Sequence, residues 1–126
     1  MKNSVVVLLL FASFSTLFLA DQLDRVASLL QTGQSHEISK ISVDNMELNI
    51  LGDEKTVSKA QAETMLNAFF TTNKPSSAKV IHRMDTNPNL LYAVAQLHTS
   101  GGNFRVSYSL GNQQITELRI ETEKGQ

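Results

Sequence analysis

Four alternating segments in the C-terminal third of the chain limit its fold more than any other feature. Apolar and polar residues alternate along each segment, and turn-forming residues separate one segment from the next. A period of two is typical of strands with one buried face, and short turns join antiparallel neighbours. The pattern therefore predicts an antiparallel meander with strands at Ala78–Asp85, Leu90–Thr99, Asn103–Leu110 and Gln114–Glu121.

The residues before the meander predict helices that cover one face of it. Residues 21–31 carry an apolar stripe at helical spacing, and Gly33 follows as a stop signal. A second, short helix is expected to bury Ile38 and Ile41. The stripe of the first helix comprises Leu23, Val26, Ala27 and Leu30.

A hairpin and a third helix are expected between these helices and the meander. Residues 46–50 alternate as a half-buried strand, and Gly52-Asp53 turns the chain into a short returning strand. Ser58 is followed three residues later by Gln61, which is the pattern of a capping box. The third helix therefore starts there and ends near Asn73.

The N-terminus has the pattern of a secretory signal peptide. Lys2 precedes the apolar run Val5–Leu19, and Ala20 offers a small residue for cleavage. The alternative is a retained membrane anchor, although the run is short for a span. A lipoprotein anchor is excluded because no cysteine follows. We expect residues 1–20 to be a signal peptide and residues 21–126 to be a single exported domain, periplasmic or extracellular.

Charge and cysteine content exclude several function classes. The chain has 11 Lys and Arg against 12 Asp and Glu, and the signal peptide removes one Lys and no acid. A net charge near −2 without basic clusters argues against nucleic-acid binding. The absence of cysteine excludes a disulfide framework and thiol catalysis.

The central hairpin predicts which residues share a side of the sheet. A two-residue loop at Gly101-Gly102 would place Ala95 opposite Tyr108, and facing residues share a side. The inner side, which the helices should cover, then carries Leu91, Ala93, Ala95, Leu97, Phe104, Val106, Tyr108 and Leu110. The outer side carries Tyr92, Val94, Gln96, His98, Arg105, Ser107 and Ser109.

The two flanking strands are placed by the same reasoning. A three-residue loop at Gly111–Gln113, or a bulge near Thr116, is needed to keep apolar residues of the last strand on the inner side. In the first strand, Val80 and Met84 should face inward on hydrophobicity, which takes His82 with them.

The predicted pocket lies on the inner side. The small residues Ala93 and Ala95 would leave space, while His82 and Tyr108 would supply polar groups that orient a ligand. The alternative is an ordinary core in which both polar side chains are satisfied by hydrogen bonds.

Catalytic acids, metal sites, serine nucleophiles and phosphate-binding loops have weaker support in the sequence. Asp44 and Glu47 are the only acids expected near the mouth of such a pocket, and both suit solvated positions. No metal site is predicted, because the histidines are widely spaced and form no ligand pair. The serines lack a convincing histidine and acid partner, and Gly101-Gly102 precedes no helix that would bind phosphate.

The outer side carries a cluster that has two interpretations. It is a solvated face with weak ion pairs, or a dimer or partner interface, for which Tyr and Arg are favoured. We favour the second, because an open face with Tyr92 benefits from a cover. The predicted partner face comprises Tyr92, His98, Arg105, Glu117 and Arg119.

Several stretches follow one another along the chain in a recognisable order and spacing. They are Val43–Leu48, Leu51-Gly52, Ser58–Ala62, Val80–His82, Thr99–Val106 and Leu118–Glu121. In this order the chain resembles the nuclear transport factor 2-like superfamily, and in particular a small exported bacterial branch known as a domain of unknown function. The resemblance implies a strongly curved sheet that forms a cone around the helices, export, and often a homodimer joined through the outer sheet face. It does not imply a reaction.

We therefore expect an α+β protein of the cone type, nuclear transport factor 2-like or cystatin-like. Its expected function is non-enzymatic binding of a small apolar ligand or a protein partner through the cone pocket. One alternative is an isomerase or hydro-lyase with His82 and Tyr108 in the pocket. Another is a purely structural dimerisation module with a filled cone. No cofactor, nucleic acid or membrane contact is expected after signal cleavage.

Overall fold

The computed structural model describes residues 22–124, so the predicted signal peptide lies outside the described residues. Within the described range, no helix is long and apolar enough to cross a membrane. The helices and strands follow one another as α2 (Gln22–Gln31), α3 (Ser35–Lys40), β1 (Ser42–Ile50), β2 (Asp53–Val57), α4 (Lys59–Thr72), β3 (Pro75–Asn87), β4 (Leu90–Thr99), β5 (Gly102–Gly111) and β6 (Gln114–Thr122).

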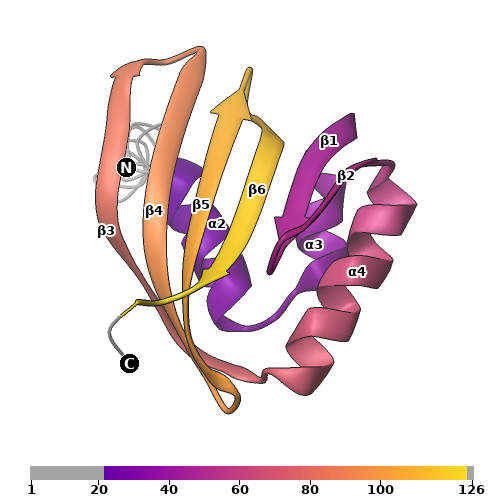
Figure 1. The fold of residues 1–126 in the computed structure, drawn as a ribbon. Helices are drawn as coiled ribbons and strands as arrows, with labels where there is room; N and C mark the ends of the chain where they lie inside the picture. Colours follow the sequence, from indigo (N-terminus) through magenta and orange to yellow (C-terminus); the bar gives the residue numbers. More distant parts are fainter. Residues whose placement is uncertain (1–21, 125–126) are drawn as a thin grey trace, which may run out of the picture.

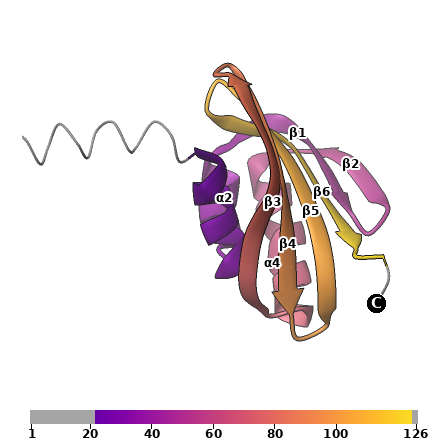
Figure 2. The same cartoon turned by 90° about the vertical axis from the view of Figure 1, so that its left-hand side faces the viewer.

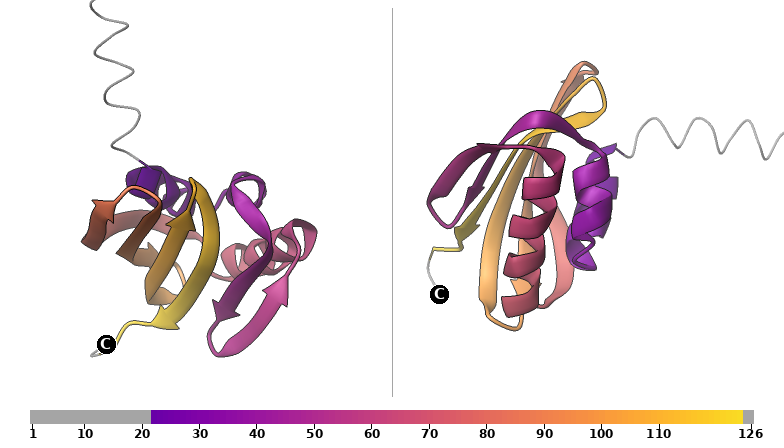
Figure 3. Two further views of the ribbon diagram at one scale, coloured as in Figure 1. Left: turned by 90° about the horizontal axis from the view of Figure 1, so that it is seen from above. Right: turned by 90° about the vertical axis from the view of Figure 1, so that its right-hand side faces the viewer.

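The strands form one curved six-stranded sheet in the order β2-β1-β6-β5-β4-β3 (Figure 1). The meander is antiparallel as expected, and β1 runs parallel to β6, so the complete sheet is mixed. Helices α2 and α4 lie on the same side of the sheet, α2 against β3 and β4 and α4 beside β1 and β2 (Figures 2 and 3). This is the predicted α+β arrangement of helices inside a curved sheet.

The local signals for the helices are confirmed. The predicted stripe of α2 is buried, and Gly33 ends the helix with a φ of 64° that suits glycine. At the start of α4, the Ser58 hydroxyl accepts from the Gln61 amide at 3.2 Å, and the Gln61 side chain accepts from the Ser58 amide at 3.0 Å. This capping box satisfies two amides that the helix itself leaves unpaired.

The central hairpin keeps the predicted sides but not the predicted pairs. Thr99 pairs with Gly102, so the loop is Ser100-Gly101 and Tyr108 lies opposite Ala93 rather than Ala95. An added Cβ on Gly101 would collide with the Asn73 side chain, which explains glycine at the second loop position. Because every partner shifts by two residues, the inner and outer sets stay as predicted.

The last strand uses the bulge rather than the longer loop. Asn112 and Gln113 form a two-residue loop with φ values of 51° and 70°, both in the left-handed region that such turns require. The register then shifts between Ser109 and Leu110, which leaves Thr116 as the extra residue. The predicted bulge near Thr116 is confirmed, and the three-residue loop is wrong.

In the first strand of the meander, the alternation of inward and outward side chains is interrupted at a point that the sequence pattern does not indicate. The register shifts between Val80 and His82, so His82 pairs with Val94 on the outer side. Arg83 instead pairs with Ala93 on the inner side. The expectation that His82 faces inward is therefore wrong, because one extra residue moves every later side chain of a strand to the opposite face.

The same register shift determines which face of the sheet Met84 and Arg83 lie on. Met84 pairs with Tyr92 and is 57% exposed, so its predicted inward position is also wrong. The Arg83 guanidinium reaches the Asp24 carboxylate of α2 at 2.6 Å, at the edge of the core. A cation on the inner side is tolerated there because it is paired and still partly hydrated.

Candidate functional site

Three of the four predicted pocket residues meet in the interior. Ala93, Ala95 and Tyr108 are buried in the core, and the Tyr108 hydroxyl donates to the backbone carbonyl of Leu23 at 2.7 Å. Burial, with the nearby Asp24 carboxylate, raises the pKa of Tyr108 above its usual value, so the phenol is a donor at neutral pH. Tyr108 therefore occupies the space beside Ala93, with its hydroxyl already paired; ligand binding by this group stays a prediction.

The fourth predicted pocket residue is on the other face of the sheet. His82 is exposed, and its ring centroid lies 6.4 Å from that of Tyr92. His82 and Tyr108 therefore do not converge on one site. An acid–base pair of these two residues is geometrically unsupported.

The acids considered from sequence lie outside the cone interior. Asp44 and Glu47 are both exposed, and Glu47 accepts a hydrogen bond from the Thr56 hydroxyl at 2.6 Å. A carboxylate that abstracts protons at neutral pH needs an apolar site to raise its pKa. Among residues 22–124, no group of three or more His, Asp and Glu side chains is placed to hold a metal ion.

Sequence reasoning missed a polar cluster that joins α3 to α4. The Glu63 carboxylate lies 2.9 Å from His36 Nδ1 and accepts from the Ser39 hydroxyl at 3.3 Å. The hydrogen bond from His36 lowers the pKa of Glu63. Ser39 donates to Glu63 and to the His36 carbonyl rather than to the imidazole, so the cluster is no nucleophilic triad.

The predicted partner-face residues do share the outer face. They come from β4 (Tyr92, His98), β5 (Arg105) and β6 (Glu117, Arg119). Arg105 lies opposite Glu121 in the register, and the Arg119 guanidinium pairs with Glu121 at 3.2 Å. The outer face is therefore a ladder of alternating charges with Tyr92 at one side.

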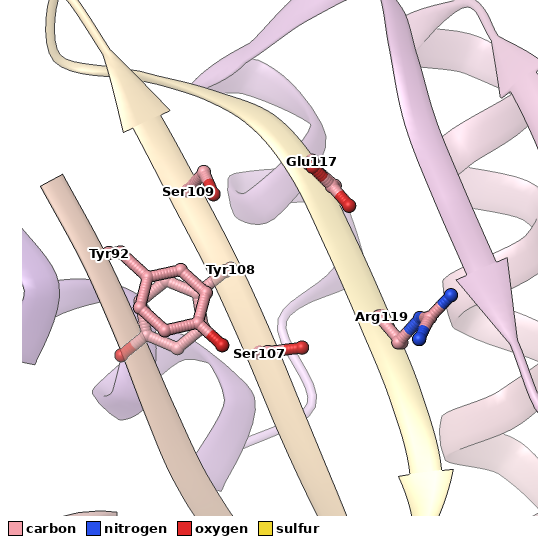
Figure 4. A pocket seen from close by; sticks show the side chains of 6 residues that line it. All are labelled: Tyr92, Ser107, Tyr108, Ser109, Glu117 and Arg119. Carbon is pink, nitrogen blue, oxygen red and sulfur yellow. The ribbon is translucent and has the colours of Figure 1, made fainter. Parts of the chain in front are cut away.

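The outer face also contains a hollow, which the sequence analysis did not predict. It has a volume of about 240 Å³. Figure 4 shows Tyr92 lying across β5 with its hydroxyl toward Ser107, while the Tyr108 ring lies behind the strand. The face dips there because β5 presents two serines between larger side chains. The hollow is lined by Tyr92, Ser107, Tyr108, Ser109, Glu117 and Arg119.

Beside this hollow, an apolar strip is exposed on β3 and β4. Met84 faces Tyr92 across the two strands, and Leu90 lies two residues before Tyr92 on the same side. Ile81, at the bulge of β3, is 45% exposed, Met84 57% and Leu90 59%. We call Ile81, Met84, Leu90 and Tyr92 the apolar strip.

A second hollow follows α4 where it faces the β1–β2 hairpin. It has a volume of about 390 Å³, and Ile50, Leu51, Met65 and Phe69 supply apolar walls. An adjoining hollow of about 350 Å³ shares Met65 and extends toward the start of α4. Together they form a shallow, mainly apolar groove beside β1 and β2, at the opposite end of the sheet from β3 and β4 (Figure 1). We call it the α4 groove.

Comparison with known proteins places the chain in a family. The family model described as Domain of unknown function (DUF4783) matches residues 23–121. A DUF4783 family protein from Bacteroides ovatus is 31% identical, with a TM-score of 0.72 over 79% of this chain and 93% of that chain. One from Bacteroides uniformis is 27% identical, with the same TM-score over 79% and 94%. No curated protein matches the chain.

A more distant structure agrees on the fold alone. A domain of unknown function with a cystatin-like fold from Nostoc punctiforme is 12% identical, with a TM-score of 0.61 over 81% of this chain and 73% of that chain. The resemblance inferred from the order of the elements is thus confirmed for family and fold. The chain belongs to the DUF4783 family, and its domain has the curved-sheet cone of nuclear transport factor 2-like and cystatin-like proteins.

Proposed function

We propose that this protein is an exported, non-enzymatic interaction module that forms a homodimer through the outer face of its sheet. The observation that carries the proposal is the apolar strip. Exposed apolar groups grouped on one surface commonly mark interaction sites, whereas single ones need no explanation. Met84 and Leu90 flank Tyr92, which is a residue type enriched in interfaces.

The charges beside the apolar strip suit a self-complementary interface. In a two-fold interface the same patch meets itself, so basic and acidic groups on one patch pair with their opposites on the second copy. Arg105, Glu117 and Arg119 alternate in sign next to the strip. A stable interface of this kind buries roughly 800 Å² on each partner.

The interior gives no support to the isomerase alternative. The only phenol on the inner side, Tyr108, donates to Leu23, and His82 lies on the other face. The isomerase alternative needs a carboxylate in the apolar interior, and the two candidates, Asp44 and Glu47, are exposed.

The test is the oligomeric state of the mature protein by light scattering. We expect a concentration-dependent dimer for the wild type and a monomer for Met84→Glu. Leu51→Glu is the matched control, because Leu51 is similarly exposed at 51% but lies on the β1–β2 hairpin. A wild type that stays monomeric at high concentration refutes the proposal, as does equal dissociation by both substitutions.

A second candidate function is binding of a small apolar ligand in the α4 groove. Its support is the apolar wall formed by Leu51, Met65 and Phe69 in a hollow within the size range of ligand pockets, roughly 300–1,000 Å³. An environment-sensitive apolar dye should gain fluorescence with the wild type and lose that gain in Met65→Lys. Equal fluorescence with both proteins would exclude the groove.

Export is tested separately. We propose that residues 1–20 direct secretion and are removed after Ala20. Fractionation of the host cells followed by N-terminal sequencing should yield a periplasmic or extracellular protein that starts at Asp21. A chain that keeps its first residues in the membrane fraction would support the anchor instead.

A further inference from the structure

The hollow between Tyr92 and β6 offers a different kind of site from the apolar strip. Its polar groups come in cross-strand pairs, with Ser107 opposite Arg119 and Ser109 opposite Glu117. Tyr92 lies flat over β5 beside them, so one face of its ring borders the hollow (Figure 4). The hollow thus combines an aromatic surface with four polar side chains on two neighbouring strands.

Most of these polar groups are not engaged within the protein. Among residues 22–124, the side chains of Ser107, Ser109, Glu117 and Tyr92 make no hydrogen bond or ion pair. The Arg119 guanidinium uses one nitrogen on Glu121 and keeps its other donors. The hollow therefore presents hydroxyls, a carboxylate acceptor and guanidinium donors to whatever enters it.

The charges of the lining indicate a neutral ligand. An anion would meet the Glu117 carboxylate, and Arg119 is already partly neutralised by Glu121. A cation would meet Arg119. A ligand with adjacent hydroxyl groups, in contrast, donates to the carboxylate and accepts from the guanidinium, while a C–H face packs on the ring of Tyr92.

The size of the hollow limits the ligand to one ring. Ligand pockets for drug-sized molecules are roughly 300–1,000 Å³, and this hollow is about 240 Å³. Cleavage of a glycosidic bond is not indicated, because such enzymes place two carboxyl groups around the bond and Glu117 is the only carboxylate in the lining.

We propose that this hollow binds a single neutral sugar ring, stacked on Tyr92 and hydrogen-bonded by Glu117, Arg119 and the two serines. The hollow shares Tyr92, Glu117 and Arg119 with the proposed dimer face, so a sugar ring and a second copy of the chain would compete for these side chains. A small surface hollow that holds one ring should bind with millimolar affinity, for which Kd is about 1 mM.

The test is an amide NMR titration of the mature protein with methyl glycosides of glucose, galactose and N-acetylglucosamine at millimolar concentrations. We expect at least one to shift the amides of Ser107, Ser109 and Glu117 in a saturable way. Glu117→Gln should weaken that binding by roughly tenfold, a loss of one good hydrogen bond. Glu54→Gln, which removes an exposed carboxylate on β2, outside the hollow and outside the outer-face cluster, should leave it unchanged.

Two further measurements test the specificity of the binding and its relation to the proposed dimer. Sorbitol has the hydroxyls but no flat C–H face, and it should produce no saturable shift; equal shifts with sorbitol would overturn the proposal. The same titration on the monomeric Met84→Glu variant separates the two proposals, because no second copy covers the hollow there and the outcome does not depend on whether the wild type dimerises. No saturable shift with any glycoside, or shifts confined to other surfaces, would overturn the sugar site.

Discussion

Replacement of Tyr108 by Phe tests whether the cone interior is a packed core or a binding site. The substitution keeps the buried ring and removes the hydroxyl that donates to the Leu23 carbonyl at 2.7 Å. Leu23 lies in the first turn of α2, so by helical geometry its carbonyl also accepts an amide four residues on. The carbonyl is therefore not left without a partner.

The expected loss is that of one net hydrogen bond, about 1 kcal/mol in the free energy of unfolding. For a domain of this size, 1 kcal/mol lowers the melting temperature by roughly 4–8 °C. Urea unfolding followed by circular dichroism measures the loss directly. Tyr92→Phe is the matched control, because it removes a phenol oxygen on the outer face, and such substitutions usually stay within about 0.5 kcal/mol.

The same pair of proteins has a diagnostic pH dependence. The folded state raises the pKa of Tyr108, so the stability that the protonated phenol contributes is complete below the usual tyrosine pKa of 10.0 and is lost as pH rises above it. The difference between wild type and Tyr108→Phe should therefore shrink above about pH 10. Equal stability of the two proteins at neutral pH, or a difference that persists unchanged at alkaline pH, would refute the anchoring role.

Three other changes follow from the structure. Ala95→Leu should destabilise the fold by roughly 1–3 kcal/mol in urea unfolding, because the interior is packed; a tolerated leucine would indicate an open cavity. Ser58→Ala should cost about 1 kcal/mol through loss of the capping box, and an unchanged urea midpoint would contradict it. Glu63→Gln should lower the melting temperature at neutral pH but not in acid: the lowered Glu63 pKa means that its contribution with His36 is present above the usual pKa of 4.5 and lost as pH falls below it. A difference that persists in acid would exclude the charge as its cause.

The side assignment of the meander was predictable from alternation, whereas its exact pairs were not. Alternation defines which residues share a face, and a shift of two residues leaves that property unchanged. Tyr108 therefore ended on the inner side although its partner is Ala93. The pair itself depends on the loop, where the side chain of Asn73 leaves room only for glycine at position 101.

The prediction that His82 lines the pocket was wrong for a reason that no local sequence pattern indicates. The bulge after Val80 moves His82 outward and Arg83 inward, and Arg83 then pairs with Asp24 on a helix 59 residues earlier. Hydrophobicity alone favoured the opposite assignment of inward and outward residues. The sequence does not show that the Asp24 carboxylate lies at the edge of the core, where it can pair with Arg83. The exposed Met84 follows from the same shift.

Part of the candidate site on the outer face could be predicted from the sequence. Tyr92, Glu117 and Arg119 were expected there as a partner surface, and all three lie on that face. The hollow between them was missed, although two serines alternating on one strand between larger neighbours is a signal for a depression. Its depth depends on how Tyr92 lies across β5, which is a tertiary property.

The sequence alone determined the type and order of the elements, because helix stripes, caps and strand alternation are local and repeat along the chain. It also determined the family, since the order and spacing of those elements persist where identity is low. Only the tertiary structure decided what fills the cone and which face β3 turns outward. Both depend on where α2 lies against the sheet, with Leu23 accepting from Tyr108 and Asp24 pairing with Arg83 across a long separation in the chain.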